Sequence, residues 1–428
     1  MFKTIAEAFK VKDLRKKILI TLLLLFIYRV GCWIPCVGFS TSIVDTSSSN
    51  FGFFELMNLV SGGALSNCSI LALGVSPYIT ASIVIQLLTV AIPALERAAK
   101  SGEDGRRKIN LYTRITALIL AIAQAVGIVV AYSDNLAQDL AGLPAWMIGA
   151  GVVITMVAGA MFTVWIGERI TDLGIGNGTS LLIFVGILAT AGQSLFQAIQ
   201  FTIQDINYIW YIVLFIVAVI AIFALIVFID GGERRINVQY AKQIKGRKMY
   251  GGQSNYIPIK VNATGVMPII FANALLTFPQ LIISIFWPDV TWYSDWLGTN
   301  SWLYIVLTAL LILVFAFFYS KITFDPNDIS KRIQQQGGFI PGIRAGKPTA
   351  EYLGKVSGRI TLFGAIFLAC IALVPSLTFK AIGGATTASI LINAFSTTGL
   401  MIVVSVALEL DKQLSAQMFM RNHKGFLN

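Results

Sequence analysis

Ten apolar runs, each long enough to cross a lipid bilayer, constrain the fold of this 428-residue sequence more than any other feature. A transmembrane helix needs about 20 consecutive, mainly apolar residues. Only 12% of the residues are charged and 56% are hydrophobic, which leaves too few charges to cover a soluble protein of this size. The sequence therefore predicts an all-α integral membrane protein with ten transmembrane helices. The expected spans are residues 18–37, 70–91, 114–132, 147–166, 179–198, 208–229, 264–287, 302–320, 360–376 and 386–408.

The basic residues gather in every second connecting segment. Of the 32 Lys and Arg residues, 30 fall in the amino-terminal stretch, in the loops after spans two, four, six and eight, or in the tail; Arg29 and Lys380 are the exceptions. Because basic residues resist translocation, this asymmetry predicts that both termini lie on the cytoplasmic side of the membrane. It also accounts for the net charge of +11. Arg29 lies near the outer end of the first span, where we expect its side chain to snorkel toward water.

The sequence offers little that could support catalysis or metal binding. The first apolar run follows a basic stretch but lacks a small-residue cleavage site, so it is expected to be a retained span. Cys32, Cys36, Cys68 and Cys370 show no metal-ligand spacing, and the one histidine, His423, lies in the tail. A Cys32–Cys36 disulfide is conceivable, although isolated apolar thiols are favoured. With no Cys/His pair and no intramembrane carboxylate pair, neither an enzyme nor a cofactor is predicted.

Ten spans divide into two sets of five, and this parity suggests an inverted repeat. Because five is odd, two similar halves, residues 1–205 and 206–428, would have opposite orientations in the membrane. One local parallel supports this division: Gly74 and Gly265 each lie three residues before a proline, in spans two and seven. Two interrupted helices beside a central path would explain the pattern, and so would ordinary kinked helices.

The segment before the second span is helical in pattern but too short to cross the membrane. It covers residues 53–65 and contains Glu55, Asn58 and Ser61, which are poorly suited to lipid contact. A re-entrant helix packed among the spans would keep these polar groups inside protein. An amphipathic helix on the outer surface is the open alternative.

Several short strings of residues point to one known family. They are Ser61-Gly62-Gly63-Ala64-Leu65, Pro77-Tyr78-Ile79-Thr80-Ala81-Ser82-Ile83, Gly105-Arg106-Arg107-Lys108, Gly174-Ile175-Gly176-Asn177-Gly178, Tyr240-Ala241-Lys242 and Phe339-Ile340-Pro341-Gly342-Ile343-Arg344. In this order and at this spacing they resemble the bacterial SecY family, whose members are channel subunits of the Sec protein translocase. The resemblance extends from the first span to the tail.

The resemblance implies a clamshell of two inverted five-helix halves around an hourglass-shaped central pore. A ring of aliphatic side chains narrows that pore at mid-membrane, and the matching positions are Val75, Ile79, Ile183, Ile270 and Ile402. A collar of branched apolar side chains excludes water and ions by dewetting. Taken one by one, these residues would also suit an ordinary core. Ile402 is the least regular match, because the approach to it, Ser396–Gly399, departs from the family pattern.

Two mobile parts of such a channel are also implied. Residues 54–65 resemble the family's plug, a short re-entrant helix that fills the outer funnel, and its residues here are Phe54, Leu56, Gly62, Gly63 and Leu65. Spans two and seven, backed by spans three and eight, resemble the lateral gate that opens toward lipid. The polar residues expected at this gate are Thr80, Gln86, Gln124 and Asn273.

The large basic inner loops, residues 230–262 and 321–359, are the expected docking surfaces. Retention of positive charge on the inner side would alone explain their sign. The resemblance adds partners: the ribosome, through ribosomal RNA, the SecA motor ATPase, SecE-like and SecG-like membrane subunits, preproteins with their signal sequences, and membrane lipid. The residues implied in docking are Lys242, Arg247, Lys248 and Arg344, and Ala345 stands where the family usually has proline.

Two functions from different classes fit these patterns. The resemblance implies a protein-conducting channel that translocates unfolded polypeptides and releases hydrophobic segments laterally into the cytoplasmic membrane. A secondary transporter for a small solute is the alternative, but it would need a specific polar or charged pocket at the midplane. The glycine-rich run 174–178 lacks the lysine of a phosphate-binding loop, so energy would come from a partner or from the membrane potential.

Overall fold

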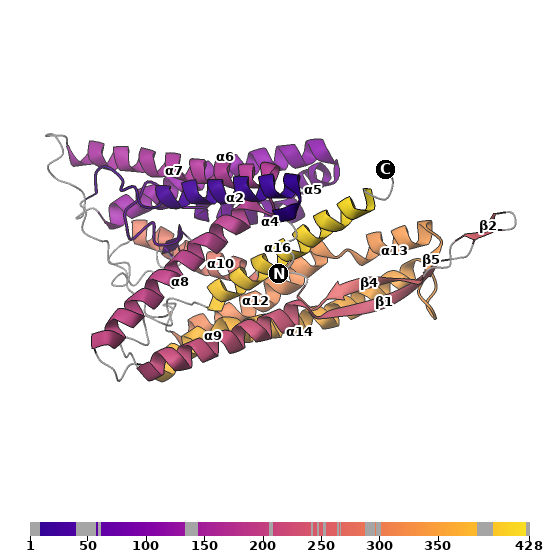
Figure 1. Cartoon of the computed structure of the whole chain (residues 1–428). Coiled ribbons are helices and arrows are strands. Elements are labelled where there is room, and N and C mark those ends of the chain that lie inside the picture. The colour runs from indigo at the N-terminus through magenta and orange to yellow at the C-terminus, as the bar shows by residue number, and fades with distance from the viewer. Residues whose placement is uncertain are drawn as a thin grey trace.

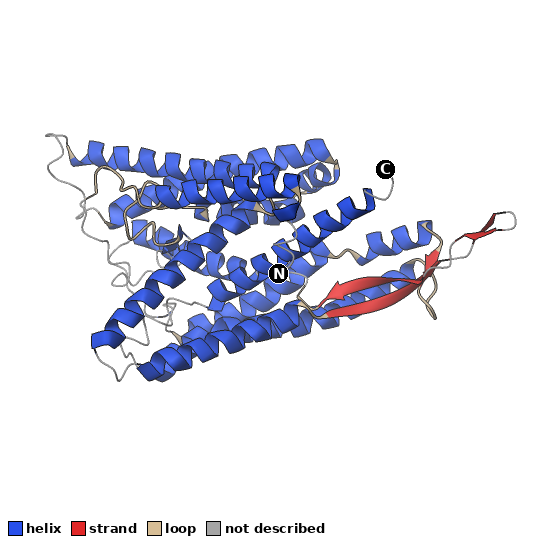
Figure 2. Cartoon of the chain, in the orientation of Figure 1, coloured by secondary structure: helices blue, strands red, loops and turns tan. Residues whose placement is uncertain are grey.

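The structure is a computed structural model that describes residues 9–39, 57–58, 61–132, 144–204, 209–240, 243–245, 248–250, 254–262, 265, 267–286, 296, 301–382 and 397–424. Helices make up most of this part of the chain, and its strands gather toward one end (Figure 2).

The first half of the chain contributes six labelled helices. They are α2 (Lys12–Gly31), α4 (Ser76–Ala91), α5 (Pro93–Lys100), α6 (Glu103–Ala131), α7 (Ala145–Leu173) and α8 (Gly178–Gln204). Pro93 opens α5 after an extended Ile92, and α4 and α5 meet at an angle of 108°. Proline suits the first turn of a helix but cannot continue the hydrogen bonds of the helix before it, so the chain bends sharply there.

The second half contributes six more. They are α9 (Ile209–Asp230), α10 (Met267–Phe286), α12 (Trp302–Thr323), α13 (Pro326–Gln335), α14 (Lys347–Ile382) and α16 (Thr397–Lys424). Two of these helices begin at side-chain caps: Ser301 accepts a hydrogen bond from the backbone N–H of Leu303, and Asp325 accepts one from that of Asn327. Such caps satisfy backbone donors that have no partner within the helix.

A β-ribbon corrects the all-α prediction. Strands β1 (Glu233–Tyr240) and β4 (Ser254–Lys260) pair antiparallel with Ile236 opposite Ile257, and β5 (Gly338–Phe339) joins the other edge of β1. A separate small hairpin is formed by β2 (Gln243–Lys245) and β3 (Lys248–Tyr250). Along β1, buried Ile236 and Val238 alternate with exposed residues, as expected for a strand with one covered face. The many charges of this loop concealed the alternation, which is the sequence signal for a strand.

Fewer membrane-spanning helices can be identified among the described residues than the sequence predicts. Within the described residues, α6, α7, α8, α12 and α14 are long and apolar enough to cross a bilayer, and the bent pair α4–α5 would be a sixth candidate. Helices α2, α9, α10 and α16 overlap other expected spans but do not meet the same criterion over their described residues. The structure thus shows a multi-pass membrane protein, and the number ten stays a prediction.

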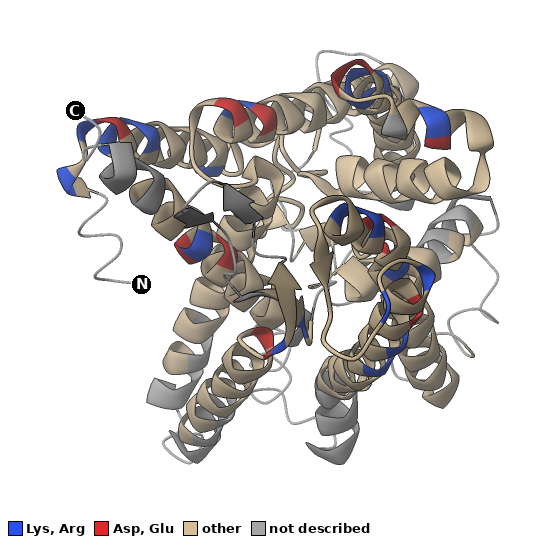
Figure 3. Ribbon diagram, turned by 90° about the vertical axis from the view of Figure 1, so that its right-hand side faces the viewer, with Lys and Arg blue, Asp and Glu red and all other residues tan. Residues whose placement is uncertain are grey.

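The helices fall into two groups that follow the order of the chain. Helices α2 and α4–α8 contact one another, as do α10, α12, α14 and α16, with α9 against α16 (Figure 1). The groups meet chiefly through α6 against α10 and through α8 against α16. The β-ribbon extends from the end of the bundle where many Lys and Arg residues lie (Figures 1 and 3).

Candidate functional site

The five aliphatic residues predicted to form a ring lie in one hydrophobic cluster. Val75 caps the start of α4 and Ile79 lies in its first turns, while Ile183, Ile270 and Ile402 come from α8, α10 and α16. Val75, Ile183 and Ile402 are buried, and Ile79 and Ile270 are half-buried. The structure therefore brings together five positions that span more than 300 residues of sequence, and it surrounds them with further apolar side chains.

Two glycines position this cluster. Gly74 (φ +54°) precedes α4 and Gly265 (φ +60°) precedes α10, so both glycines of the repeated pattern adopt the left-handed conformation that other residues disfavour. Residues 69–75 form turns, and α4 begins only at Ser76, so the expected helix over 70–91 is shorter than predicted. The break before α4 favours an interrupted helix over a simple kink.

Part of the plug-like segment lies beside the cluster. Phe54 and Leu56 are outside the described residues, whereas Gly62 (φ +73°), Gly63 (φ +84°) and Leu65 lie in a tight turn. The N–H of Gly63 donates to the carbonyl of Asn58 at 2.9 Å. The left-handed backbone at both glycines is the reason that glycine is required at these positions.

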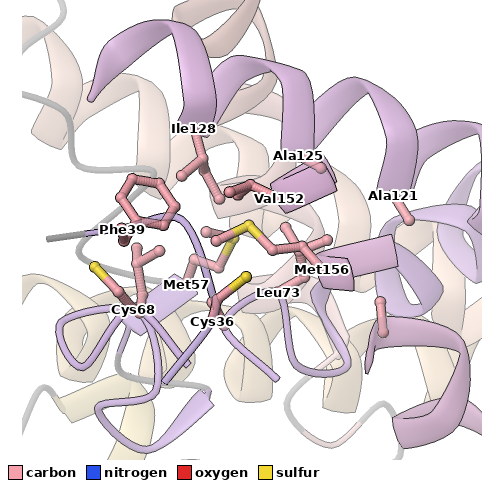
Figure 4. Packing of buried hydrophobic residues seen from close by; sticks show 13 residues of the cluster. Cys36, Phe39, Met57, Cys68, Leu73, Ala121, Ala125, Ile128, Val152 and Met156 are labelled. Atoms are coloured by element: carbon pink, nitrogen blue, oxygen red, sulfur yellow. The ribbon is translucent and has the colours of Figure 1, made fainter. Parts of the chain in front are cut away.

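Leu65 is buried in an apolar cluster on the side of the bundle away from the β-ribbon, which we call the outer cluster. Figure 4 shows its labelled members, among them Cys36, Met57, Cys68 and Met156. Ala121, Ala125 and Ile128 enter it from α6, and Val152 and Met156 from α7. All four cysteines are free thiols, and the conceivable Cys32–Cys36 disulfide is not formed.

Three side chains at the end of α2 hold this segment by its backbone carbonyls. Arg29 Nη1 donates to the carbonyl oxygen of Gly62 at 2.7 Å, while Tyr28 Oη and Cys32 Sγ lie 3.4 Å and 3.8 Å from that of Ser61. Arg29 thus makes an inward hydrogen bond, and the prediction that it simply snorkels is wrong. The signal for this role was the spacing of Tyr28, Arg29 and Cys32, which places polar groups along one side of a helix end.

Neighbouring atoms leave no room for a side chain at Gly62. A Cβ atom at Gly62 would lie 2.9 Å from the Cα of Gly186 in α8 and 2.8 Å from Arg29 Nη1. No side chain fits between two backbones at that separation. The segment is therefore fastened to α2 and packed against α8.

The predicted gate residues occupy different environments. Thr80 and Gln86 bond within α4, to the carbonyl of Ser76 at 3.1 Å and to Ser82 Oγ at 3.3 Å. Gln124 of α6 is only 2% exposed, and within the described part of the chain its Oε1 has no hydrogen-bond partner. Asn273 is half-buried on α10, the helix that contacts α6. A buried amide oxygen without a partner makes the packed arrangement less favourable, by about 1–3 kcal/mol.

The structure describes two of the four predicted docking residues. Lys242 and Arg247 lie outside the described residues, and Lys248 begins strand β3. Arg344 is exposed in the turn after β5, where its carbonyl accepts a hydrogen bond from buried Thr349 Oγ1 at 2.8 Å. Gly342 and Gly346, both with positive φ, bracket this turn, so its shape does not depend on the proline that Ala345 replaces.

The basic loops form one structural unit. Ile236, Val238 and Ile259 of the ribbon share a core with Ile333 of α13 and Leu353 of α14. The ribbon and the turn that contains Arg344 therefore pack on the same hydrophobic core.

The glycine-rich run 174–178 is a tight connection between α7 and α8. A Cβ at Gly178 would collide with the carbonyl of Gly167, and Asn177 Oδ1 accepts hydrogen bonds from the N–H and the hydroxyl of Thr179. These glycines let two helices approach closely, which is a packing role. Among the described residues, no group of three or more His, Cys, Asp or Glu side chains could hold a metal ion.

Comparisons with known proteins agree on one family. The SecY family model matches residues 69–410. The protein translocase subunit SecY of Streptomyces scabiei is 42% identical over 443 aligned positions, which cover 100% of both chains.

Two solved structures share the fold, and each aligns over 95% of this chain and 93% of its own. The first is a SecY protein whose plug domain stabilises the closed state of the translocation channel and maintains a membrane seal (TM-score 0.67, 20% identity). The second is Sec61 in the canine ribosome–channel complex from the endoplasmic reticulum (TM-score 0.65, 18% identity).

Proposed function

This chain belongs to the SecY family of protein translocase subunits, and from that premise we propose that five of its aliphatic side chains form the constriction of its pore. The protein is a multi-pass membrane protein and a protein-conducting channel, and its family is not enzymatic. The alternative of a secondary transporter finds no support. The proposed constriction consists of Val75, Ile79, Ile183, Ile270 and Ile402.

One observation carries this proposal: the five side chains converge in one cluster although they come from four helices of both halves. A ring needs contributions from all sides, and helices α4, α8, α10 and α16 supply them. Branched apolar side chains repel water and ions and yet offer no fixed partner to a passing polypeptide. The proposed collar therefore seals the resting channel and still yields to a substrate.

The test replaces Ile183 with glycine and measures ion conductance of the resting channel in planar bilayers. We expect conductance to rise by about tenfold, because the collar loses a bulky wall and water can enter. Leu188→Gly is the matched control, since Leu188 lies in the same helix but is 45% exposed on the surface. Equal conductance in the two variants would contradict the assignment of Ile183 to the constriction.

We further propose that residues 54–65 act as the plug and that α4 and α10, backed by α6 and α12, form the lateral gate. The bonds from α2 to Ser61 and Gly62 support a resting position for the plug. The contact of α6 with α10, and the buried polar side chain of Gln124 on α6, support a seam that parts at modest cost. The two halves that would move are residues 1–205 and 206–428.

The proposed orientation places both termini and the β-ribbon in the cytoplasm, with the chain in the cytoplasmic membrane. The positive residues of the inner segments support this orientation. The proposed partners are SecE-like and SecG-like subunits, the SecA motor ATPase, and the ribosome. The Sec61 neighbour, which was solved on a ribosome, supports the last of these.

Charge reversal at Arg344 tests motor docking. Arg344→Glu should reduce SecA-driven export of a preprotein into proteoliposomes and leave membrane insertion of the channel intact, because Arg344 is exposed at the tip of a turn. Lys355→Glu, on the adjacent helix α14, controls for the general loss of positive charge. Normal export by Arg344→Glu would refute the role.

A further inference from the structure

One carboxylate connects three elements at the base of the β-ribbon. Asp230 is the last residue of α9, and its Oδ1 accepts a hydrogen bond from Asn262 Nδ2 at 2.6 Å. Its Oδ2 accepts a second from Ser405 Oγ of α16 at 2.9 Å. Both oxygens of a single side chain are thus engaged by residues far apart in the sequence.

The backbone around Asn262 has little freedom to move. Asn262 is buried, and the N–H of Val261 donates to the carbonyl of Gly232 at 3.0 Å, closing the ribbon just before β1 and after β4. On the other side, a Cβ added at Gly364 of α14 would lie 2.4 Å from the carbonyl oxygen of Val261. The ribbon base is packed directly against a helix backbone, so a displacement of the ribbon must move its neighbours.

The same carboxylate lies between the ribbon and two helices that carry proposed constriction residues. Ser405 follows Ile402 on α16 by about one helical turn. Asn262 precedes α10, which begins at Met267 and carries Ile270. Asp230 therefore joins the cytoplasmic ribbon to the α16 and α10 sides of the constriction.

Charged side chains surround this junction. Burial and the nearby cation Lys260 at the end of β4 lower the pKa of Lys412 on α16, while the carboxylates of Asp230 and Glu233 act in the opposite direction. Charges from the ribbon, α9 and α16 thus influence one another electrostatically. Hydrogen bonds to a charged group are stronger than those between neutral groups, so this junction can transmit a shift that weaker contacts would absorb.

We propose that Asp230 is a coupling residue, through which a partner bound to the cytoplasmic β-ribbon acts on the constriction by moving α16. This inference rests on the proposed function, because it takes the cluster around Ile402 as the constriction. Docking on the ribbon shifts the Asn262 side of the carboxylate. The bond to Ser405 then carries that shift to α16 and so to Ile402.

A merely structural role would predict a different behaviour. If Asp230 only stabilised the fold, its loss would lower the amount of assembled channel and reduce every activity in proportion. A coupling residue instead separates two quantities: the affinity of the partner for the channel and the response of the pore to the bound partner. The test must therefore measure both.

The experiment uses the full-length chain with its accessory subunits in proteoliposomes, with SecA and a preprotein. Ser405→Ala removes one bond and leaves the carboxylate, so it is the mildest variant, and Ser405→Thr restores the hydroxyl. For Ser405→Ala we expect unchanged SecA binding and unchanged resting conductance, with translocation per bound motor reduced about fivefold to tenfold. Ser405→Thr should recover most of the rate, and Asp230→Asn should resemble Ser405→Ala.

Each result decides between the alternatives. A wild-type translocation rate in Ser405→Ala would overturn the inference, as would a loss of SecA binding that parallels the loss of rate. Ile183→Gly, measured in the same vesicles, reports on the constriction independently. If Ile183→Gly leaks and Ser405→Ala translocates normally, only the coupling role fails; if Ile183→Gly does not leak, the proposed constriction fails first.

Discussion

The two contacts between the halves of this molecule differ in chemistry. We call α6 against α10 the front seam and α8 against α16 the back seam. On the helices of the front seam, Gln124 of α6 is a buried amide whose Oε1 has no partner in the described part of the chain, and Asn273 of α10 is half-buried. Across the back seam, Leu181 and Ile183 share an apolar cluster with Ile402 and Val406. A seam that buries an unpaired polar group opens at lower cost than one that is uniformly apolar.

The back seam continues toward the end of the bundle from which the β-ribbon extends (Figure 1). There Leu14 of α2, Ile175 of the α7–α8 turn and Leu414 of α16 form a further apolar cluster. The plug-like segment is also fastened on this side, to α2 and against α8. Under the proposed lateral gate, we expect the hinge at the back seam and the opening at the front seam. Four predictions test it.

The largest effect is expected at the back seam, from Gly176→Val. Gly176 has φ +84°, and a Cβ there would lie 2.8 Å from Leu410 Cδ2 of α16. A β-branched residue in that conformation should destabilise the assembled channel by about 2–4 kcal/mol. The measurement is thermal unfolding in detergent. Gly192→Val in α8 is the control, because no described atom lies within 4 Å of its Cβ position; equal melting temperatures would show that the back seam does not hold the halves.

The second effect concerns the anchor of the plug-like segment. Arg29→Met removes the donor to the Gly62 carbonyl and should raise resting ion conductance roughly tenfold, since a hydrogen bond from a charged group is worth about 1.5–3 kcal/mol. Arg29→Lys keeps a cationic donor and should leak less. Conductance equal to wild type in Arg29→Met would show that α2 does not hold this segment.

The third effect is at the front seam. Gln124→Leu replaces the unpaired amide by an apolar group of similar size and should stabilise the closed seam by about 1–2 kcal/mol. We expect slower membrane insertion of a substrate with a weakly hydrophobic signal sequence. Gln86→Leu, where the amide already bonds to Ser82, is the matched control. Faster insertion by Gln124→Leu would reverse the assignment of the weaker seam.

The smallest effect is expected away from both seams. Arg114 of α6 and Glu168 of α7 form a two-pronged ion pair, at 2.7 Å and 2.8 Å, with half-exposed side chains. Exposed pairs contribute less than about 1 kcal/mol and weaken as salt screens them. Arg114→Ala should lower the melting temperature slightly at low salt and not at high salt. A marked change in insertion rate would show that the contact of α6 with α7 also takes part in opening.

Much of this arrangement could be predicted because side-chain period and motif spacing are local properties. The ring positions Val75, Ile79, Ile183, Ile270 and Ile402 came from the resemblance of several short strings to the SecY family, and the four-residue spacing of Val75 and Ile79 agreed with it. Gly74 and Gly265 were predicted as positions where a helix is interrupted, and both have a left-handed backbone conformation. The two glycines could be predicted because the proline that follows each of them is a local signal.

Other features depend on which distant groups meet, and they escaped prediction for that reason. The sequence gives Arg29 a position near a helix end, but the carbonyl that it bonds to belongs to a turn 33 residues later. The β-ribbon was hidden because its charges suggested a loop, although Ile236 and Val238 alternate as strand residues do. The pairing of Asp230 with Ser405 joins positions 175 residues apart and has no local signal at all.

The sulfur content of the outer cluster has a mechanical consequence. Met57 of the plug-like segment and Cys68 of the turn that follows it share this cluster with Met156 and Cys36 (Figure 4). Thioether and thiol side chains are soft and polarizable, and unbranched methionine fills irregular gaps at small energetic cost. Side chains of this kind can repack when the plug-like segment is displaced. They can pack against the segment again when it returns, and no cavity remains. Reversible resealing is thus a property of the lining itself, which a wall of branched aliphatic residues would not possess.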